Sequence, residues 1–214
     1  MSNDPAKHEW RKAEKAIYLP KRQPEVIELP AFKYITIRGD GNPNGPEFAQ
    51  HISALYPIAY GIKMTAKRPD CILPGHYDYT VYPLEGVWDL NERGRQQSSS
   101  GPINKDDLVY TLMIRQPDFV DEAFFEMIKA RALQKQDNPL IEKVRFETIS
   151  EGRCIQMLHV GPFDDEPASF QTMEVFAQSQ GLKRHSKRHR EIYLSDFRKT
   201  APEKLKTVLR FQLV

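Results

Sequence analysis

The sequence predicts an α+β fold in which two strand–helix–strand–strand repeats form a joint antiparallel sheet. The helices are expected on one face of this sheet and a ligand cleft on the other. The first observation is that segments with apolar residues at every second position alternate with stretches of helical period. The second is an internal similarity: "ITIRGDG" at 35–41 and "IQMLHVG" at 155–161 are each followed by a helix-like stretch, then by "GIK" at 61–63 or "GLK" at 181–183. The glycine that ends the first motif and the one that begins the second are 20 residues apart in both copies, which indicates a repeated order of elements.

The first repeat is expected to span about 24–116. Its elements are predicted, in order, as a strand at 26–38, a helix from about Glu47, a strand at 77–90, a flexible polar hairpin loop at 91–107 and a strand at 108–116. The helix has an apolar stripe that includes Phe48 and Ile52, typical of a helix with one buried face. Pro57 lies within it and is expected to kink the helix or end its regular part, because proline has no backbone N–H to donate.

A linking helix is predicted near 121–136, within a connection of about 117–140, with Phe124, Phe125 and Ile128 on its buried face. The second repeat follows at about 141–214, so the chain is expected to form a single domain over 1–214. Its elements are predicted as a strand at 144–159, a helix after the loop "GPFDDEP" that ends before Gly181, a strand at 190–196, a short turn of helix with Thr200 and Glu203 at capping-box spacing, and a strand at 207–214.

Composition excludes several classes of protein. The 214 residues are 40 % hydrophobic and 28 % charged, which is ordinary for a globular protein, and no apolar run reaches the roughly 18 residues that span a bilayer. The N-terminal stretch is charged and lacks the apolar core of a signal peptide, so we expect a cytoplasmic protein with no membrane partner. The sequence contains neither a phosphate-binding glycine motif nor a metal-type cysteine spacing, and no cofactor is expected. Cys154 lies in an apolar strand-like run and is expected as a buried thiol.

The net charge of +2 is too small to indicate nucleic-acid binding by itself. The densest basic run, "KRHSKRHR" at 183–190, could contact phosphates. It contains no aromatic residues that would stack on bases, so we interpret it as a solvated turn between a helix and the next strand.

Aromatic residues and one carboxylate concentrate on strands whose other face should meet the helices. On the face of the sheet that is free of helices we expect Tyr79, Tyr82, Trp88, Tyr110, Glu191 and Tyr193. Taken singly, each aromatic ring is explained by packing, and Glu191 by solvation on a strand. Taken together, the rings could attract an organic cation through their π faces, and Glu191 could supply the opposing charge. A partly buried glutamate of this kind is also a candidate general base.

At this point the chain resembles a known family. The motifs "HREIYLSDFRKTAPEKLKTVLR", "MLHVGPFDDEP" and "YTVYPLEGVWDL", together with the two repeats, are similar to the GyrI-like small-molecule-binding domain, above all to its stand-alone bacterial members. The resemblance implies that Glu191 lies among aromatics in a ligand pocket between the repeats. In regulator members the domain is fused to a DNA-binding module and senses cationic drugs, whereas some stand-alone members hydrolyse cyclopropane-bearing, DNA-alkylating natural products. Only about 25 residues precede the first strand here, so no DNA-binding module is expected. The N-terminal piece is instead predicted to form a short helix anchored by Trp10.

Three functions remain open from the sequence. The first is a binding protein for aromatic, hydrophobic or cationic small molecules, a monomer or homodimer without a nucleic-acid partner, whose ligand residues are Glu191, Tyr193, Tyr79, Tyr82, Trp88 and Tyr110. The second is a hydrolase of the cyclopropane-opening kind, in which Glu191 acts as general base on water and a tyrosine donates to the oxygen that gains charge. That tyrosine is Tyr193 or one of Tyr79, Tyr82 and Tyr110. The third is a haem- or tetrapyrrole-binding module with His159 and His51 as candidate axial ligands.

Overall fold

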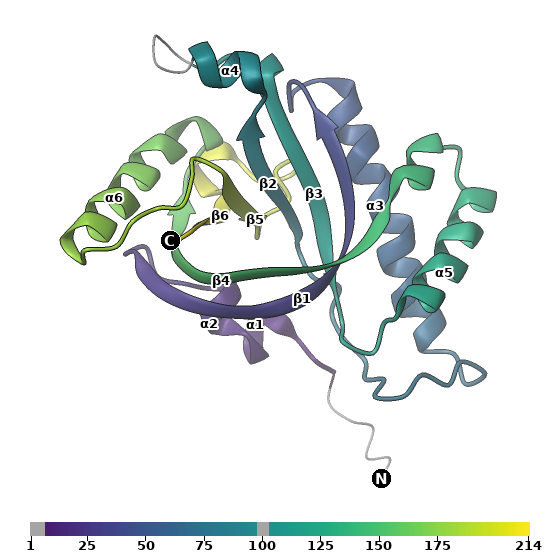
Figure 1. Cartoon of the computed structure of the whole chain (residues 1–214). Helices are drawn as coiled ribbons and strands as arrows, with labels where there is room; N and C mark the ends of the chain where they lie inside the picture. Colours follow the sequence, from purple (N-terminus) through teal and green to yellow (C-terminus); the bar gives the residue numbers. More distant parts are fainter. Residues whose placement is uncertain (1–6, 98–102) are drawn as a thin grey trace.

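The computed structural model describes residues 7–97 and 103–214, and its six strands form a closed antiparallel barrel (Figure 1). Around the barrel the strands follow the order β1-β3-β2-β5-β6-β4. Their bounds are β1 (Glu25–Asp40), β2 (Leu84–Leu90), β3 (Leu108–Gln116), β4 (Arg145–Val160), β5 (His189–Tyr193) and β6 (Lys206–Gln212). The predicted mixture of helices with one antiparallel sheet is confirmed. The expectation of a sheet with one free face is wrong, because the sheet closes on itself.

Closure results from the two longest strands, β1 and β4, which have 16 residues each. The C-terminal half of β1 pairs with β3, while Glu25 to Thr36 pair with Arg145 to Gln156 of β4. The other end of β4 pairs with β6. Each long strand therefore pairs at one end with a strand from its own half of the chain. Along the rest of its length it pairs with the long strand from the other half. Pairing of β2 with β5 seals the second seam.

Helices cover the outside of the barrel in two groups. Helix α3 (Pro46–Ala66) packs on β1 and β3 and is itself covered by α5 (Glu122–Lys135), whereas α6 (Glu166–Ser179) packs on β4. Figure 1 shows α3 and α5 on one side of the strands and α6 on the other. The predicted linking helix is confirmed, with Phe124, Phe125 and Ile128 buried.

Pro57 does not end α3, which continues to Ala66, so of the two expected effects of this proline an early end of the helix is wrong. A proline inside a helix costs about 3 kcal/mol through its lost hydrogen bond and steric clash. The residues around it, Leu55, Ile58 and Ala59, are almost fully buried against the core. Burial of this apolar face on both sides of Pro57 offsets the local cost.

The segments before and after β2 differ from their predictions. The strand expected at 77–90 begins only at Leu84, and residues 77–83 form an extended segment with one isolated bridge, between Tyr79 and His8. That bridge ties down an N-terminal arm with two short helices, α1 (Trp10–Ala13) and α2 (Lys15–Tyr18), which confirms the predicted short helix with a buried Trp10. The predicted flexible loop at 91–107 instead contains α4 (Glu92–Gln97) and the turn η1 (Lys105–Asp107), and its residues 98–102 lie outside the described part.

Three further single turns complete the fold: η2 (Pro139–Lys143), η3 (Phe163–Asp165) and η4 (Pro202–Lys204). The short turn predicted near Thr200 is present as η4, but the capping box is wrong, because the residue before the turn is Ala201 and no side chain caps it. The strand predicted at 190–196 is shorter and ends at Tyr193.

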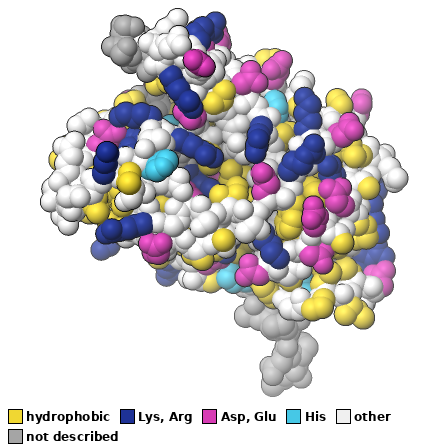
Figure 2. Space-filling view, viewed as in Figure 1, with side chains coloured by type: hydrophobic (Ala, Val, Ile, Leu, Met, Phe, Trp, Pro, Cys, Tyr) yellow, Lys and Arg dark blue, Asp and Glu magenta, His cyan; other side chains and the backbone are white. Residues whose placement is uncertain are grey.

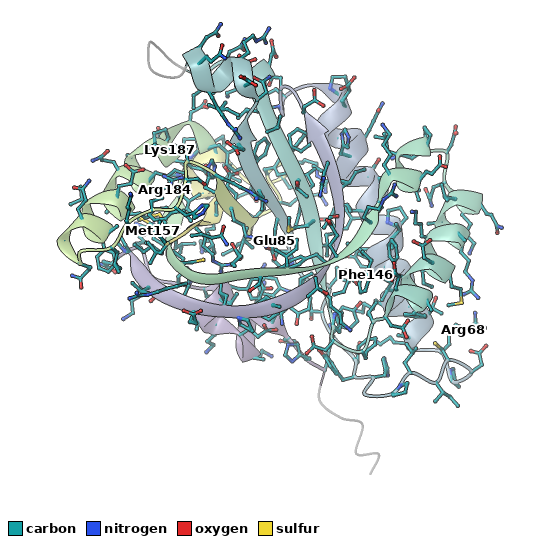
Figure 3. The ribbon with its side chains drawn as sticks, viewed as in Figure 1. Arg68, Glu85, Phe146, Met157, Arg184 and Lys187 are labelled. Carbon is teal, nitrogen blue, oxygen red and sulfur yellow. The ribbon has the colours of Figure 1, made fainter. Side chains whose placement is uncertain are left out.

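The inside of the barrel is polar. Arg190 Nη1 lies 2.5 Å from Glu85 Oε2, Arg190 Nε lies 3.0 Å from Glu151 Oε1, and Arg210 Nη1 lies 2.9 Å from Glu151 Oε2. Figure 3 labels Glu85 near the centre of the ring of strands. The interpretation of residues 183–190 as a solvated turn is therefore wrong at its last residue, because Arg190 is 3 % exposed and holds two buried carboxylates. These buried ion pairs make the inside of the barrel a poor environment for an apolar ligand.

The end of α6 offers a direct check on the fold. Gly181 has a φ of 65°, and the N–H groups of Gly181 and Leu182 donate to the carbonyls of Gln178 and Ala177. This is the Schellman arrangement that the sequence predicts. Gly181→Ala is expected to destabilise the protein by about 1 kcal/mol, because a left-handed backbone is costly for any residue with a Cβ. The added Cβ itself would meet no other part of the described structure within 4 Å, apart from its neighbours in the chain.

Urea unfolding measures this loss. Ser179→Ala, two residues earlier in helical backbone, is the matched control and should change stability by less than about 0.5 kcal/mol. Equal losses in the two variants would contradict the assigned cap.

Candidate ligand-binding and catalytic site

Strand β5 divides its side chains between the two faces of the barrel wall. Arg190 points inward to Glu85, whereas Glu191 and Tyr193 lie on the outer face. The outer face is the one covered by α3 and α6, so these residues meet helices and not an open cleft on the opposite face. The sequence-based placement of the cleft on the helix-free face is therefore wrong. The helix-free face is the inside of the barrel.

A chain of hydrogen bonds links three of the predicted site residues. Trp88 Nε1 donates to Tyr193 Oη at 2.8 Å, and the Tyr193 hydroxyl donates to Glu191 Oε2 at 2.8 Å. The other Glu191 oxygen lies 3.1 Å from His189 Nε2. Burial, followed by the charge of Glu191, raises the pKa of Tyr193 well above its usual value, so this phenol keeps its proton at neutral pH.

Gly86 makes this arrangement possible. It pairs directly with Glu191 across the β2–β5 ladder. A Cβ at Gly86 would lie 2.7 Å from Trp88 Nε1 and 2.8 Å from Tyr193 Oη, closer than any real contact allows. The space that a side chain would fill is thus occupied by the hydrogen bond between Trp88 and Tyr193.

A second carboxyl group, that of Glu166, lies beside Glu191. Glu166 is the first residue of α6, is only 5 % exposed, and is close enough to Glu191 for the two carboxyl groups to interact. Burial and then the neighbouring charge of Glu191 raise the pKa of Glu166 well above its usual range. Its Oε1 has no hydrogen-bond partner among the described residues.

Aromatic rings surround these polar groups. Trp88 contacts Phe48 of α3 and Tyr110 of β3, with ring centroids 5.7 and 5.1 Å apart, and Phe163 lies edge-on to Tyr193 at 5.9 Å. The structure therefore brings four predicted site residues into one cluster: Trp88, Tyr110, Glu191 and Tyr193.

A cleft of about 210 Å³ opens beside this cluster, between α3, the start of β2 and the segment after β5. Tyr193 and Tyr82 line it, together with Tyr56, Tyr60 and Phe197. Glu191 does not line the cleft. It lies behind Tyr193, and the residue is only 9 % exposed. Tyr193 therefore connects the two, since it lines the cleft and its hydroxyl donates to Glu191.

Tyr79 and Tyr82 do not join the Glu191 cluster. Tyr79 is buried against Tyr77, Tyr82 and Phe119. Tyr82 donates to Glu14 Oε1 at 2.7 Å and borders the cleft at the end nearest the N-terminal arm. The extended segment 77–83 carries both tyrosines away from the strand register that the sequence suggested.

The structure gives no support to haem ligation by His159. Its Nδ1 lies 2.9 Å from Ser169 Oγ and its Nε2 lies 3.1 Å from the carbonyl oxygen of Pro162, so both ring nitrogens are used by the protein. His51 contacts Tyr110 through its ring and bonds to the Glu47 carbonyl. Within the described residues no cluster of three or more His, Cys, Asp or Glu could hold a metal ion.

Sequence reasoning missed Glu166, Phe48, Phe163 and His189. Glu166 belongs to "GPFDDEP", which the sequence suggests is only a turn, yet an acidic residue at the first turn of a helix is a signal of the helix start. Nothing in the local pattern places it against Glu191, which is 25 residues further along the chain.

Two properties of the surface and helices complete the description. On the face shown in Figure 2, basic and acidic side chains are interspersed and do not form separate regions, in keeping with the small net charge. None of the described helices is both long and apolar enough to cross a membrane.

The structure combines a closed barrel flanked by helices with an aromatic cleft on its outer, helix-covered face, beside a buried pair of carboxyl groups. Residues 22–214 match the model of the GyrI-like small molecule binding domain. The chain belongs to this family.

Solved structures from Listeria innocua are similar over nearly the whole chain. One, described as a hydrolase, is 37 % identical with a TM-score of 0.85, over 97 % of this chain and 100 % of that one. Another, described as an uncharacterized conserved protein, is 38 % identical with the same TM-score and coverage. A more distant likeness, to EcmrR in a complex with DNA, has 14 % identity and a TM-score of 0.50 over 95 % of this chain and 60 % of the other, and it bears on the fold alone. No curated protein matches the chain.

Proposed function

We propose that the protein is a hydrolase that binds a flat hydrophobic compound in the cleft and opens a strained, electrophilic ring in it with water. The observation that carries this proposal is the hydrogen bond from Tyr193, a residue that lines the cleft, to Glu191, which has the second carboxyl group of Glu166 beside it. A carboxylate that only balanced the charge of a bound cation would need to face the ligand directly. Glu191 faces a phenol and another carboxyl group, which is an arrangement suited to moving a proton.

Glu191 is the base in this proposal, and Tyr193 transmits the proton. Water adds to a carbon of a cyclopropane conjugated with a carbonyl group, the ring C–C bond breaks, and its electron pair moves to the carbonyl oxygen. As the water loses a proton to Tyr193 Oη, the Tyr193 proton passes to Glu191. Glu191 then releases its proton to solvent and the oxygen that gained charge takes up a proton from solvent, so the net change is addition of one water molecule.

The role of Tyr193 thus differs from the one expected from the sequence. Its proton already points at Glu191. The hydroxyl is therefore engaged as a link to the base and is not free to donate to a substrate oxygen. Trp88 holds the Tyr193 oxygen in place from the other side.

The similarity of a Listeria innocua protein described as a hydrolase supports the proposal, at 37 % identity over 97 % of this chain. The family description, a small molecule binding domain, is compatible both with a hydrolase and with a protein that only binds its ligand. The catalytic reading therefore depends on the chemistry of the site.

The test is to incubate the protein with a cyclopropane-bearing, carbonyl-conjugated compound in ¹⁸O-labelled water and to analyse the products by mass spectrometry. We expect ring-opened product that carries one labelled oxygen and forms in proportion to protein concentration. Binding of the compound, measured by fluorescence, without faster formation of this product would show that the protein binds but does not hydrolyse it.

A further inference from the structure

The N-terminal arm, residues 8–18, supplies one wall of the cleft. Trp10 and Arg11 line it, although the family match begins only at residue 22. We propose that this arm sets ligand specificity, and that Arg11 selects flat ligands with an anionic or carbonyl group and rejects organic cations. The inference rests on the proposed function of the cleft as a ligand site and names the class of compound that the site accepts.

The arm is a fixed wall. The His8 N–H donates to the carbonyl oxygen of Asp78 at 2.7 Å, and the Thr80 N–H donates back to His8 at 2.9 Å. Trp10 is 3 % exposed, and its Nε1 donates to the carbonyl oxygen of Val81 at 3.0 Å. Because both backbone and side chain hold the arm against residues 78–81, the position of Arg11 at the cleft is defined.

Arg11 brings an uncompensated positive charge to the cleft. Its guanidinium lies 4.4 Å from the centroid of the Trp10 ring, and Nη2 donates to the carbonyl oxygen of Leu194 at 3.1 Å. The other charged side chains at the cleft, Arg198 and Asp196, form a two-point ion pair with each other at 2.9 and 3.1 Å. No carboxylate of the described residues forms an ion pair with Arg11.

This arrangement has a direct consequence for ligands. A guanidinium carries five N–H donors in a planar fork, and the Leu194 carbonyl engages only one side of it. A carboxylate or carbonyl oxygen on a ligand can accept from the remaining donors, while the ligand's rings contact Trp10, Tyr56 and Tyr60. An ammonium group in the same place meets a like charge.

The test uses three probes with the same ring system: 2-naphthoate, 2-naphthalenemethanol and 2-naphthylmethylammonium. Affinities are measured by isothermal titration calorimetry with wild type, Arg11→Glu and Lys12→Glu. Lys12 is the matched control, since it lies on the same short helix and its side chain is 78 % exposed and paired with Glu9. Both substitutions change the net charge of the protein equally.

We expect wild type to bind the carboxylate best and the ammonium worst. Arg11→Glu should weaken the carboxylate by about tenfold, tighten the ammonium by a few-fold, and leave the alcohol nearly unchanged. Lys12→Glu should keep the wild-type order. Equal shifts in Arg11→Glu and Lys12→Glu would assign the effect to the overall field of the protein and overturn the role of Arg11.

The outcomes separate this inference from the proposed function. If wild type binds all three probes with equal affinity and hydrolyses its substrate, the selection by Arg11 is wrong and the site stands. If no probe binds and no compound is hydrolysed, the cleft is not a ligand site and both proposals fail. Because Arg11 is exposed, its substitution should leave the fold intact, and circular dichroism checks this.

Discussion

Glu191→Gln is expected to lower the turnover of a ring-opened substrate by about 100- to 10,000-fold, the range typical of losing a general base. Glutamine has the shape of glutamate and still offers an oxygen to the Tyr193 hydroxyl, so the hydrogen bonds at 2.8 Å from Trp88 to Tyr193 and on to residue 191 should persist. Its amide cannot accept a proton at neutral pH. The loss should therefore appear in kcat, with little change in the affinity for a non-reactive probe.

Glu203→Gln is the matched control, because Glu203 is exposed on the turn η4 and should leave turnover unchanged. The measurement is kcat and KM with the labelled-water assay, together with probe affinity. If Glu191→Gln hydrolyses the substrate at the wild-type rate, Glu191 is not the base. If kcat is retained and only affinity falls, Glu191 serves binding and the catalytic assignment fails.

Arg190→Met is expected to destabilise the protein by about 3–5 kcal/mol, the usual effect of removing one partner from a buried ion pair. Arg190 is the ion-pair partner of Glu85, whose side chain is 1 % exposed and whose Oε1 has no hydrogen-bond partner within residues 7–97 and 103–214. It also contacts Glu151 at 3.0 Å and the face of Tyr34. Without Arg190, Glu85 would be left as an unpaired carboxylate inside the barrel.

The size of this effect should depend on pH. Burial raises the pKa of Glu85 above its usual 4.5 even beside Arg190, and loss of the guanidinium should raise that pKa further. The folded variant then binds more protons than the unfolded chain above about pH 4.5, so its stability falls as pH rises. The difference from wild type should be smallest near pH 4.5 and grow toward neutral pH.

Urea unfolding at pH 5 and pH 7 measures both the loss of stability in Arg190→Met and the change of that loss with pH. Arg188→Met, an exposed arginine two residues earlier, is the control and should cost less than about 0.5 kcal/mol. The double variant Arg190→Met/Glu85→Leu should regain much of the lost stability, because it removes the unpaired charge as well. A loss in Arg190→Met no larger than that in Arg188→Met would show that the buried pair contributes little.

The local elements could be predicted because their signals are local. Period-two alternation located β1, β3, β4 and β6 to within a few residues, and Gly181 followed by Leu182 marked the end of α6. Closure of the barrel could not be predicted, because pairing between β1 and β4 joins segments whose alternating patterns do not name their partners. On β5 both faces carry charge, Arg190 on one and Glu191 on the other, so the pattern could not show which face meets the helices.

The candidate site could be predicted only in part, because only some of its residues lie on neighbouring strands. Trp88, Tyr110, Glu191 and Tyr193 lie on paired strands, so adjacency follows once the strands are placed. Glu166 comes from a helix start, and its approach to Glu191 depends on how α6 packs on the barrel. Tyr79 and Tyr82 were misplaced because the strand begins at Leu84, and Trp10 and Arg11 reach the cleft through an arm whose destination is not encoded locally.

Gly86 gives the site a signature that can be read in other chains. The contact between Trp88 and Tyr193 occupies the volume of a missing side chain, so it requires glycine at the ladder position opposite the glutamate. A homologue that keeps Glu191 but has a larger residue at this position must hold its indole and phenol differently and loses the link between cleft and carboxylate. The proposed proton relay thus predicts that family members able to carry it out have glycine and glutamate on facing strands.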